Sequence, residues 1–313
     1  MDSNLEAPPR ATHHSLADTR FPVAIIGAGA LGLHFAARLR AVVPLAVIAR
    51  NAHRVASLRT GVQVGEQTLA LEAFDAAHPP VADWVIVLVK AADTAAAAEV
   101  ASRMRPIGVL SLQNGITVDM LRGHCHAQHV DQGITTEGAW RDGNRVQPSG
   151  AGETLLPPGF EPLARMLEDA GLEARIEPEI TAARLAKLLV NVAINPLAAL
   201  FRVPNGALLE PPHRVLLDAL VREALPVLRA NGLELDEAAA LARVHGVARA
   251  TAANRASMLQ DVLAGRHTEI DAITGALLSM AEAAGLEVPT HRAVHTLVRA
   301  IERGAFDSAG GQG

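Results

Sequence analysis

The sequence predicts an α/β protein in two parts, a domain built on a mostly parallel sheet followed by a domain made only of helices. Three observations predict it. Short apolar runs typical of buried strands alternate with helical segments through the first half of the chain. A glycine-rich turn directly follows the first of these runs. After Ile180 only helical periodicity remains, interrupted by prolines and glycines.

The first domain is expected over residues 21–178, and its sheet rests on five apolar runs. These are Val23–Ile26, Leu45–Ala49, Trp84–Val89, Val109–Leu112 and His129–Gly133. Shorter runs then follow among glycine and proline turns, at Arg145–Gln147, Thr154–Leu156 and Ala174–Ile176. We expect these last three to be antiparallel strands that complete the sheet. The all-helical domain is expected over 179–304, followed by a frayed tail over 305–313.

Composition limits the possible functions. Half of the 313 residues are apolar and 19% are charged, which is typical of a globular protein. The net charge of −5 leaves no basic field for nucleic acid or an anionic membrane surface, so neither is an expected partner. Residues 1–20 lack the apolar core of a signal peptide and are expected to be a disordered extension. We therefore expect a soluble protein; a homodimer is compatible with the sequence.

The single cysteine, Cys125, cannot form an internal disulfide, which fits the reducing cytoplasm. Its neighbours His124 and His126 lack the paired spacing of a zinc site, so no metal is expected. The most apolar long run, Leu185–Phe201, contains one lysine, two asparagines and a proline. A lipid-facing helix would tolerate these poorly, so this run is expected to be a buried helix with a polar line.

A dinucleotide site is predicted where the first strand ends. The segment Gly27-Ala28-Gly29-Ala30-Leu31-Gly32 has the GxGxxG spacing and leads into a helical segment. The first glycine permits a tight turn, the second lets the backbone approach a pyrophosphate, and the third lets helix and strand pack closely. The N–H groups at the start of the helix would face the phosphates. The pattern predicts a Rossmann-type domain rather than an ordinary glycine turn.

The expected cofactor is NADP(H). Arg50 ends the second strand, where an NAD-binding fold places an acid for the ribose 2′-hydroxyl. With Asn51, His53 and Arg54 it offers a cationic pocket for a 2′-phosphate instead, although an arginine there can also be simply solvated.

Two polar residues follow later strands, Lys90 after Trp84–Val89 and Asn114 after Val109–Leu112. Parallel sheets bind ligands at these strand ends, so Lys90 could contact the cofactor and Asn114 the junction of nicotinamide and substrate. A surface charge and an ordinary turn explain the two positions about equally well.

A polar stripe is predicted on the first helix of the second domain. Lys187, Asn191 and Asn195 recur every fourth residue, which places them on one helical face. Because asparagine is a poor mid-helix residue and an exposed face usually carries charged side chains, this stripe favours a polar ligand over solvent. Further on, Ser257 lies in one helical segment, and Glu269 lies at the start of the next, where it could merely complement the helix dipole.

These residues together resemble the ketopantoate reductase family. The resemblance runs through GAGALG at 27–32, LVKA at 88–91, QNG at 113–115, KLLVNVAINPLAAL at 187–200, PNG at 204–206, SMLQD at 257–261 and RHTEID at 266–271. It covers nearly all of residues 21–302. Glu137, Trp140 and Thr274 differ from the usual family pattern.

The resemblance implies NADPH-dependent reduction of 2-dehydropantoate, a small branched 2-keto acid, to pantoate, in pantothenate and coenzyme A biosynthesis. It implies that Lys187 is the general acid and that Glu269 is its partner at the reacting oxygen and contacts the cofactor. The remaining roles follow the motifs: Asn191, Asn195, Asn205 and Ser257 would bind substrate, Asn114 and Ala139 would lie near the nicotinamide.

A proton donor beside the keto oxygen is what hydride transfer requires, because the transfer creates an alkoxide. Two other functions stay open. One is the reduction of a different small 2-keto acid, and the other is a non-catalytic NADP(H)-sensing protein.

Overall fold

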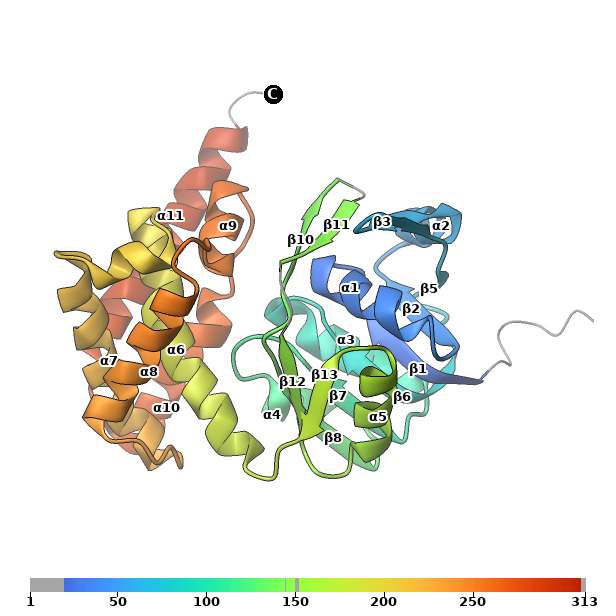
Figure 1. Cartoon of the computed structure of the whole chain (residues 1–313), viewed down its shortest axis with the longest axis horizontal. Helices are drawn as coiled ribbons and strands as arrows, with labels where there is room; N and C mark the ends of the chain where they lie inside the picture. Colours follow the sequence, from blue (N-terminus) through green and yellow to red (C-terminus); the bar gives the residue numbers. More distant parts are fainter. Residues whose placement is uncertain (1–19, 144, 150–151, 311–313) are drawn as a thin grey trace, which may run out of the picture.

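The computed structural model describes residues 20–143, 145–149 and 152–310. Of the predicted N-terminal extension, residues 1–19 lie outside the described residues, and Arg20 begins the first strand, β1 (Arg20–Ile26). The described chain forms two lobes side by side (Figure 1), with the strands in one lobe and helices alone in the other. The predicted fold class, a Rossmann-type sheet domain followed by an all-helical domain, is therefore confirmed.

The main sheet is parallel throughout, with the strand order β5-β2-β1-β6-β7-β8. Its other strands are β2 (Leu45–Ala49), β5 (Glu72–Asp75), β6 (Val81–Val87), β7 (Gly108–Ser111) and β8 (His129–Gln132). The order places β1 and β6 at the centre, so the turns that follow them lie at the middle of one sheet edge. This is the edge at which the predicted cofactor site must be assembled.

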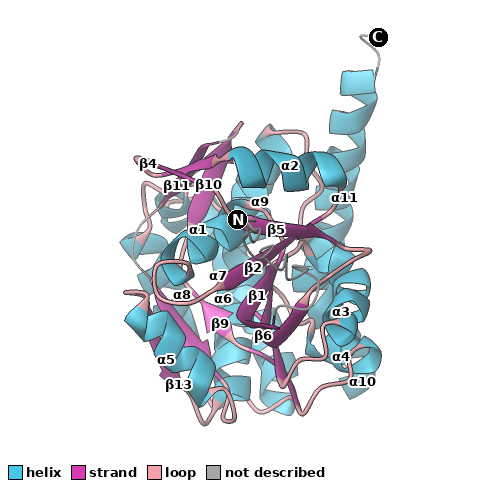
Figure 2. Ribbon diagram, turned by 90° about the vertical axis from the view of Figure 1, so that its right-hand side faces the viewer, coloured by secondary structure: helices cyan, strands magenta, loops and turns pink. Residues whose placement is uncertain are grey.

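Helices cover both faces of this sheet (Figure 2). Alternate residues of β1 point to opposite faces: Val23 and Ile25 pack in one hydrophobic cluster, Ala24 and Ile26 in another. The first cluster includes residues of α1 (Ala30–Leu39) and α5 (Glu161–Asp169). The second includes residues of α3 (Thr94–Arg103) and α4 (Val118–His124). Burial on both faces explains why the central strands are almost wholly apolar.

The later short strands differ from the prediction that they complete the main sheet as antiparallel strands. They form two smaller sheets, β10-β11-β3-β4 and β13-β12-β9, and β12 pairs with β13 in parallel. Their bounds are β3 (Val62–Val64), β4 (Gln67–Leu69), β9 (Ile134–Thr135), β10 (Ala139–Asp142), β11 (Arg145–Pro148), β12 (Glu153–Leu156) and β13 (Glu173–Ile176). Strand β8 already ends the main sheet, and α5 returns the chain between β12 and β13, which permits parallel pairing.

The second lobe begins with α6 (Ile180–Phe201), four residues after β13 ends. It continues through α7 (His213–Ala230), α8 (Glu237–Ala250), α9 (Ser257–Leu263), α10 (Ala276–Ala284) and α11 (Pro289–Gly310). In the first lobe, α2 (Ala52–Thr60) follows β2, and the short helical turn η2 (Ala91–Asp93) follows β6. The second lobe contains two short helical turns, η3 (Asn205–Leu209) and the π-helical η4 (Asp271–Gly275). Helix α11 continues to Gly310 and so includes residues 305–310 of the predicted tail, while 311–313 lie outside the described residues. No proline interrupts this stretch after Pro289, and the helical hydrogen bonds can continue.

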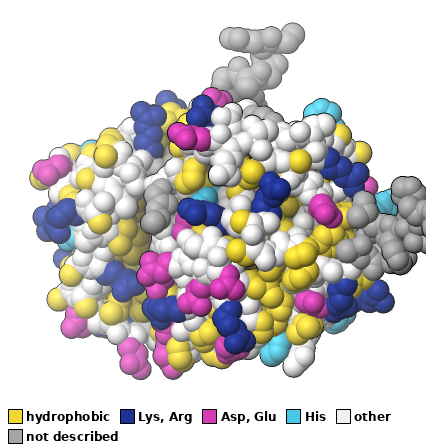
Figure 3. Space-filling view, turned by 45° about the vertical axis from the view of Figure 1, so that its right-hand side comes forward, with side chains coloured by type: hydrophobic (Ala, Val, Ile, Leu, Met, Phe, Trp, Pro, Cys, Tyr) yellow, Lys and Arg dark blue, Asp and Glu magenta, His cyan; other side chains and the backbone are white. Residues whose placement is uncertain are grey.

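Helix α6 is long and apolar enough to cross a membrane by length and composition. However, 67% of its most apolar stretch is buried inside the fold, and it packs against α7, α8, α9 and α11. These contacts are those of a core helix in a soluble protein, as the polar line in its sequence predicts. On the face seen in Figure 3, acidic and basic side chains are interspersed rather than gathered by sign.

The two lobes touch closely beside the end of β7. A Cβ atom on Gly115 would lie 2.2 Å from the carbonyl oxygen of Ala272, and Gly115 has a positive φ of 78°. Only glycine fits both constraints without rearrangement. The next residue, Ile116, donates its N–H to the same carbonyl oxygen at 3.3 Å. The Asn114 loop of the first lobe is therefore held against η4 of the second.

Candidate active site

The glycine turn after β1 has the geometry of a phosphate cradle. Gly27 has a φ of 126°, and a Cβ there would lie 2.6 Å from the Leu88 carbonyl. A Cβ on Gly32 would lie 1.8 Å from the Gly27 oxygen, so the helix and the turn pack as closely as backbone allows. By contrast, a Cβ on Gly29 would meet no atom within 4 Å. The turn therefore leaves room at its second glycine, at the start of α1, where a dinucleotide pyrophosphate would approach.

The carboxyl end of β2 is basic. Arg50 follows this strand, and its guanidinium pairs with Asp93 at 2.6 Å with 79% of the side chain exposed. Arg54 and Arg141 both donate to the carbonyl oxygen of Ala28 in the glycine turn, at 3.4 and 3.5 Å. Burial and then the charge of Arg141 lower the pKa of Arg54. Sequence reasoning missed Arg141, because β10 brings it to the turn from 113 residues further along the chain.

Lys187 lies on α6 and donates from Nζ to the backbone carbonyl of Thr135 at 2.8 Å. Burial lowers the pKa of Lys187 to about 8, and the negative charge of Glu269 opposes this shift. A lysine with this pKa is still largely protonated at pH 7 and can give up its proton easily. These are the properties of a general acid near neutral pH.

Glu269 and Asn114 meet across the two lobes. The Asn114 side-chain amide donates to the Glu269 carboxylate at 3.1 Å, joining the end of β7 to the residues just before η4. The same carboxylate acts through space on Lys187, whose hydrogen bond goes to Thr135. The structure thus brings three of the predicted site residues together at the domain junction.

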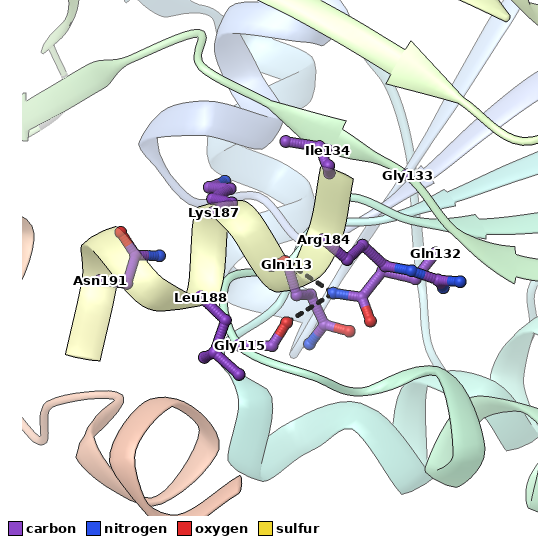
Figure 4. Close-up of a pocket in the computed structure, with 9 residues that line it drawn as sticks. All are labelled: Gln113, Gly115, Gln132, Gly133, Ile134, Arg184, Lys187, Leu188 and Asn191. Carbon is purple, nitrogen blue, oxygen red and sulfur yellow. Dashed lines mark hydrogen bonds between the residues drawn. The ribbon is translucent and has the colours of Figure 1, made fainter. Parts of the chain in front are cut away.

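A small cavity lies beside this group (Figure 4), and its lining comes from both lobes. Lys187 and Asn191 of α6 line it, while Asn195, the third residue of the predicted polar stripe, does not. Opposite them, Gln132 donates to the carbonyls of Gln113 and Gly115, at 3.2 and 2.7 Å. These bonds fix the loop that carries Asn114.

The remaining predicted substrate residues lie on the helical lobe. Asn195 is buried on α6, and Ser257 is the exposed first residue of α9. Asn205 donates to Thr251 at 2.9 Å, while its buried Oδ1 finds no hydrogen-bond partner among the described residues. Ala139 is the first residue of β10. The roles of these residues stay predictions.

Lys90 connects the lobes as well. Its ammonium pairs with the buried Asp261 of α9 at 2.6 Å, and Arg266 binds the other oxygen of that carboxylate at 2.9 Å. Lys90 thus forms an interdomain ion pair with Asp261, next to the strand end at which a cofactor contact is predicted.

Lys90 and Lys187 are the only two lysines in the sequence, and the other 26 of its 28 lysine and arginine residues are arginine. Both lie at the domain junction. Because a guanidinium stays protonated while an amine can titrate, this distribution is itself a signal of proton chemistry. Sequence reasoning passed over it.

Comparison with protein families agrees with this architecture. The model described as "Ketopantoate reductase PanE/ApbA" matches residues 23–159, and "Ketopantoate reductase PanE/ApbA C terminal" matches 179–302. The 2-dehydropantoate 2-reductase of Archaeoglobus fulgidus is 34% identical over 293 residues, covering 90% of this chain and 98% of the relative. That of Halobacterium salinarum is 36% identical over 233 residues, covering 71% and 77%.

Solved structures give the same result. A ketopantoate reductase from Ralstonia eutropha superposes with a TM-score of 0.79 at 28% identity, covering 92% of this chain and 99% of that one. A D-mandelate dehydrogenase in complex with NADH superposes with a TM-score of 0.83 at 25% identity, covering 90% and 99%. The family models span both lobes and the relatives match along most of the chain. The chain therefore belongs to the ketopantoate reductase family.

Proposed function

We propose that this protein reduces 2-dehydropantoate to pantoate with NADPH as the hydride donor. The observation that carries the proposal is the meeting of Lys187, Glu269 and Asn114 at the junction of a dinucleotide-binding sheet and a helical lobe. The names of the most similar curated relatives support the same substrate.

The glycine turn suits a nicotinamide dinucleotide, because Gly29 leaves open space at the N-terminus of α1, where backbone N–H groups can bind a phosphate. The nicotinamide supplies a hydride when it is bound. Asn114 and Ala139 are proposed to contact its ring end, and Lys90 and Glu269 to contact it from the junction.

Lys187 is proposed as the general acid. As the keto carbon gains the hydride, negative charge develops on the oxygen, and an ammonium beside it stabilises that charge and then donates its proton. Burial makes this proton easier to release, since it lowers the lysine pKa to about 8. The negative charge of Glu269 raises the pKa of Lys187 and so favours the charged ammonium. The hydrogen bond that Asn114 donates holds the Glu269 carboxylate in place.

The substrate carboxylate and hydroxyl require hydrogen-bond donors. Asn191, Asn195, Asn205 and Ser257 are proposed to supply them from the helical lobe. The buried Oδ1 of Asn205, which has no partner among the described residues, supports a contact with substrate, because this oxygen can accept a hydrogen bond from the substrate hydroxyl and is costly to leave unsatisfied.

NADPH is proposed over NADH because Arg50 stands at the end of β2, where an acid would favour the free ribose hydroxyl. Arg54 and Arg141 add positive charge next to the turn. Binding of 2′,5′-ADP and 5′-ADP, measured by calorimetry, tests this directly. Equal affinity for the two would overturn the NADP assignment.

A second candidate is the reduction of a different 2-keto acid, favoured by the likeness to D-mandelate dehydrogenase at a TM-score of 0.83. Steady-state assays with 2-dehydropantoate, 2-ketoisovalerate, pyruvate, oxaloacetate and benzoylformate separate the candidates. We expect the highest kcat/KM with 2-dehydropantoate. A higher value for any competitor would transfer the assignment to that substrate, and tight NADPH binding without turnover of any of them would favour a sensor.

The proposed compartment is the cytoplasm. The homodimer stays a prediction, which sedimentation of the purified protein at micromolar concentration tests.

A further inference from the structure

A buried histidine and glutamate join the helix of the dinucleotide turn to the segment that precedes β10. His34 lies on α1, and its Nε2 is 2.9 Å from Oε2 of Glu137, with only 3% and 5% of the two side chains exposed. Because an ionised carboxylate only accepts hydrogen bonds, His34 donates from Nε2. The bond spans 103 residues of sequence, so it ties together parts of the fold that share no local structure.

Glu137 is fixed on its other sides too. Its Oε1 accepts the backbone N–H of Gly152 at 3.1 Å, and its own N–H donates to Oγ1 of Thr135 at 3.1 Å. Thr135 Oγ1 lies 2.9 Å from Oγ1 of Thr154 on the adjacent strand β12. The segment Thr135–Ala139 is therefore held by side chains as well as by strand pairing.

One end of this segment contacts the proposed general acid, and the other end leads to the glycine turn. The carbonyl of Thr135 accepts the proton-bearing Nζ of Lys187 at 2.8 Å. At the other end Ala139 begins β10, which also carries Arg141 to the carbonyl of Ala28 in the glycine turn. A shift of the segment would change where the ammonium stands relative to the turn that holds the dinucleotide.

We propose that His34 and Glu137 are positioning residues that set the Lys187 ammonium against the bound nicotinamide by fixing the segment Thr135–Ala139. The inference rests on the proposed function for its catalytic meaning, while the contacts themselves do not depend on it. Neither residue lines the cavity beside Lys187.

The chemistry of the pair favours this role over simple stability. A buried hydrogen bond between polar side chains contributes little net stability, since desolvating the two groups offsets their attraction, and apolar side chains would fill the same space. What a charge-assisted bond adds is fixed geometry. Catalysis is sensitive to this, because a misplacement of about 1 Å can cost about 100-fold in rate.

The test compares Glu137→Ala with Glu137→Gln, which keeps the length and an acceptor for Gly152. Its amide NH2 can donate to Nε2 of His34 when that imidazole carries its proton on Nδ1, so both contacts of the carboxylate are preserved. We expect Glu137→Ala to lower kcat about 10- to 100-fold, with the Kd for NADPH from fluorescence titration within about threefold of the unaltered enzyme. Glu137→Gln should recover most of kcat. Asp218→Ala is the matched control, because it breaks a histidine-carboxylate pair with His245, 2.5 Å apart, between α7 and α8. It should leave kcat unchanged.

A second readout does not depend on turnover. Because the sequence has two lysines, protein labelled with 13C at lysine Cε gives two side-chain signals, which Lys90→Arg assigns. We expect the Lys187 signal and its titration midpoint to change in Glu137→Ala and to return in Glu137→Gln. If Glu137→Ala does not fold, His34→Ala removes the other half of the pair and is measured in the same way.

The outcomes separate the two proposals. If the unaltered enzyme reduces no 2-keto acid, the proposed function fails, and the lysine signal still decides whether the pair positions Lys187. If the unaltered enzyme is active and a folded Glu137→Ala keeps its kcat and its Lys187 signal, the positioning role fails. It fails equally if Glu137→Gln is as impaired as Glu137→Ala.

Discussion

The two lobes build their halves of the site from different materials. In the sheet lobe the cofactor turn is made of backbone, and its glycines matter for the side chains they lack. In the helical lobe the chemistry is carried by side chains, Lys187 and the asparagines, on a helix whose backbone would form without them. Damage in the first should therefore appear as lost cofactor affinity, and damage in the second as lost turnover.

The largest effect is expected for Lys187→Ala. We expect turnover to fall at least about 100-fold, the scale for removing a general acid, while NADPH affinity stays nearly intact. Stopped-flow reduction and fluorescence titration measure the two quantities separately. An exposed cation of α7, Arg222, serves as control through Arg222→Ala, which should change neither. Comparable losses of affinity and turnover in Lys187→Ala would erase the distinction between the lobes.

The opposite result is expected for Gly32→Ala. The added Cβ would lie 1.8 Å from the Gly27 oxygen, so the turn must move. Overpacking of this kind costs about 1–3 kcal/mol, which corresponds to a lower melting temperature and a roughly 5- to 150-fold loss of NADPH affinity.

Gly29→Ala sharpens this result, because its Cβ meets no protein atom within 4 Å. It should leave the melting temperature unchanged and still weaken NADPH binding. Unchanged NADPH affinity in both variants would mean that the turn is not the cofactor cradle.

A pH dependence follows from the Lys187 pKa of about 8. The reduction requires the protonated amine, so kcat should be constant below that pH, halved near it, and about tenfold lower one unit above. The reverse oxidation requires the neutral amine and should show the opposite trend. Initial rates between pH 6 and 10 in a constant-ionic-strength buffer provide the measurement. A forward rate that rises through this range would exclude Lys187 as the acid.

The smallest effect is expected for Arg50→Ala. The side chain is 79% exposed and already paired with Asp93, so its contact with a 2′-phosphate is screened by solvent. We expect the preference for NADPH over NADH in kcat/KM to fall about fivefold, equivalent to about 1 kcal/mol. Arg59→Ala, on helix α2, which begins two residues after Arg50, is the control. If the preference for NADPH is unchanged in Arg50→Ala and falls when Arg54 is replaced, the selectivity comes from Arg54, which contacts the glycine turn.

Much of the sheet could be predicted because its strands are apolar on both faces. The predicted bounds of β2 are the observed ones. Strand β1 ends at Ile26, directly before the predicted glycine motif. Strands β3, β4 and β5 were missed, since they are three or four residues long and β4 has no buried residue to mark its period. The partners of β12 could not be predicted either, because pairing depends on where α5 returns the chain.

The candidate site divides in a similar way. The spacing of Lys187, Asn191 and Asn195 is local, so a helical period is enough to place them on one face. The Asn114 and Glu269 contact joins residues 155 positions apart, and only the family resemblance suggested that they share a site. The Thr135 carbonyl that holds Lys187 could not be foreseen, because every residue offers a carbonyl and the sequence does not mark the one in use.

Because the two lysines of the sequence both lie at the domain junction, a reagent that reacts with side-chain amines can modify that junction selectively. Acylating electrophiles react with neutral amines and leave guanidinium groups intact, so Lys90 and Lys187 are the two side-chain amines in the sequence that can form stable amides with them. Lys90 is held in an ion pair, while half of Lys187 is neutral near pH 8. Among the side-chain amines, such a reagent at that pH would therefore place its reporter group where the two lobes meet.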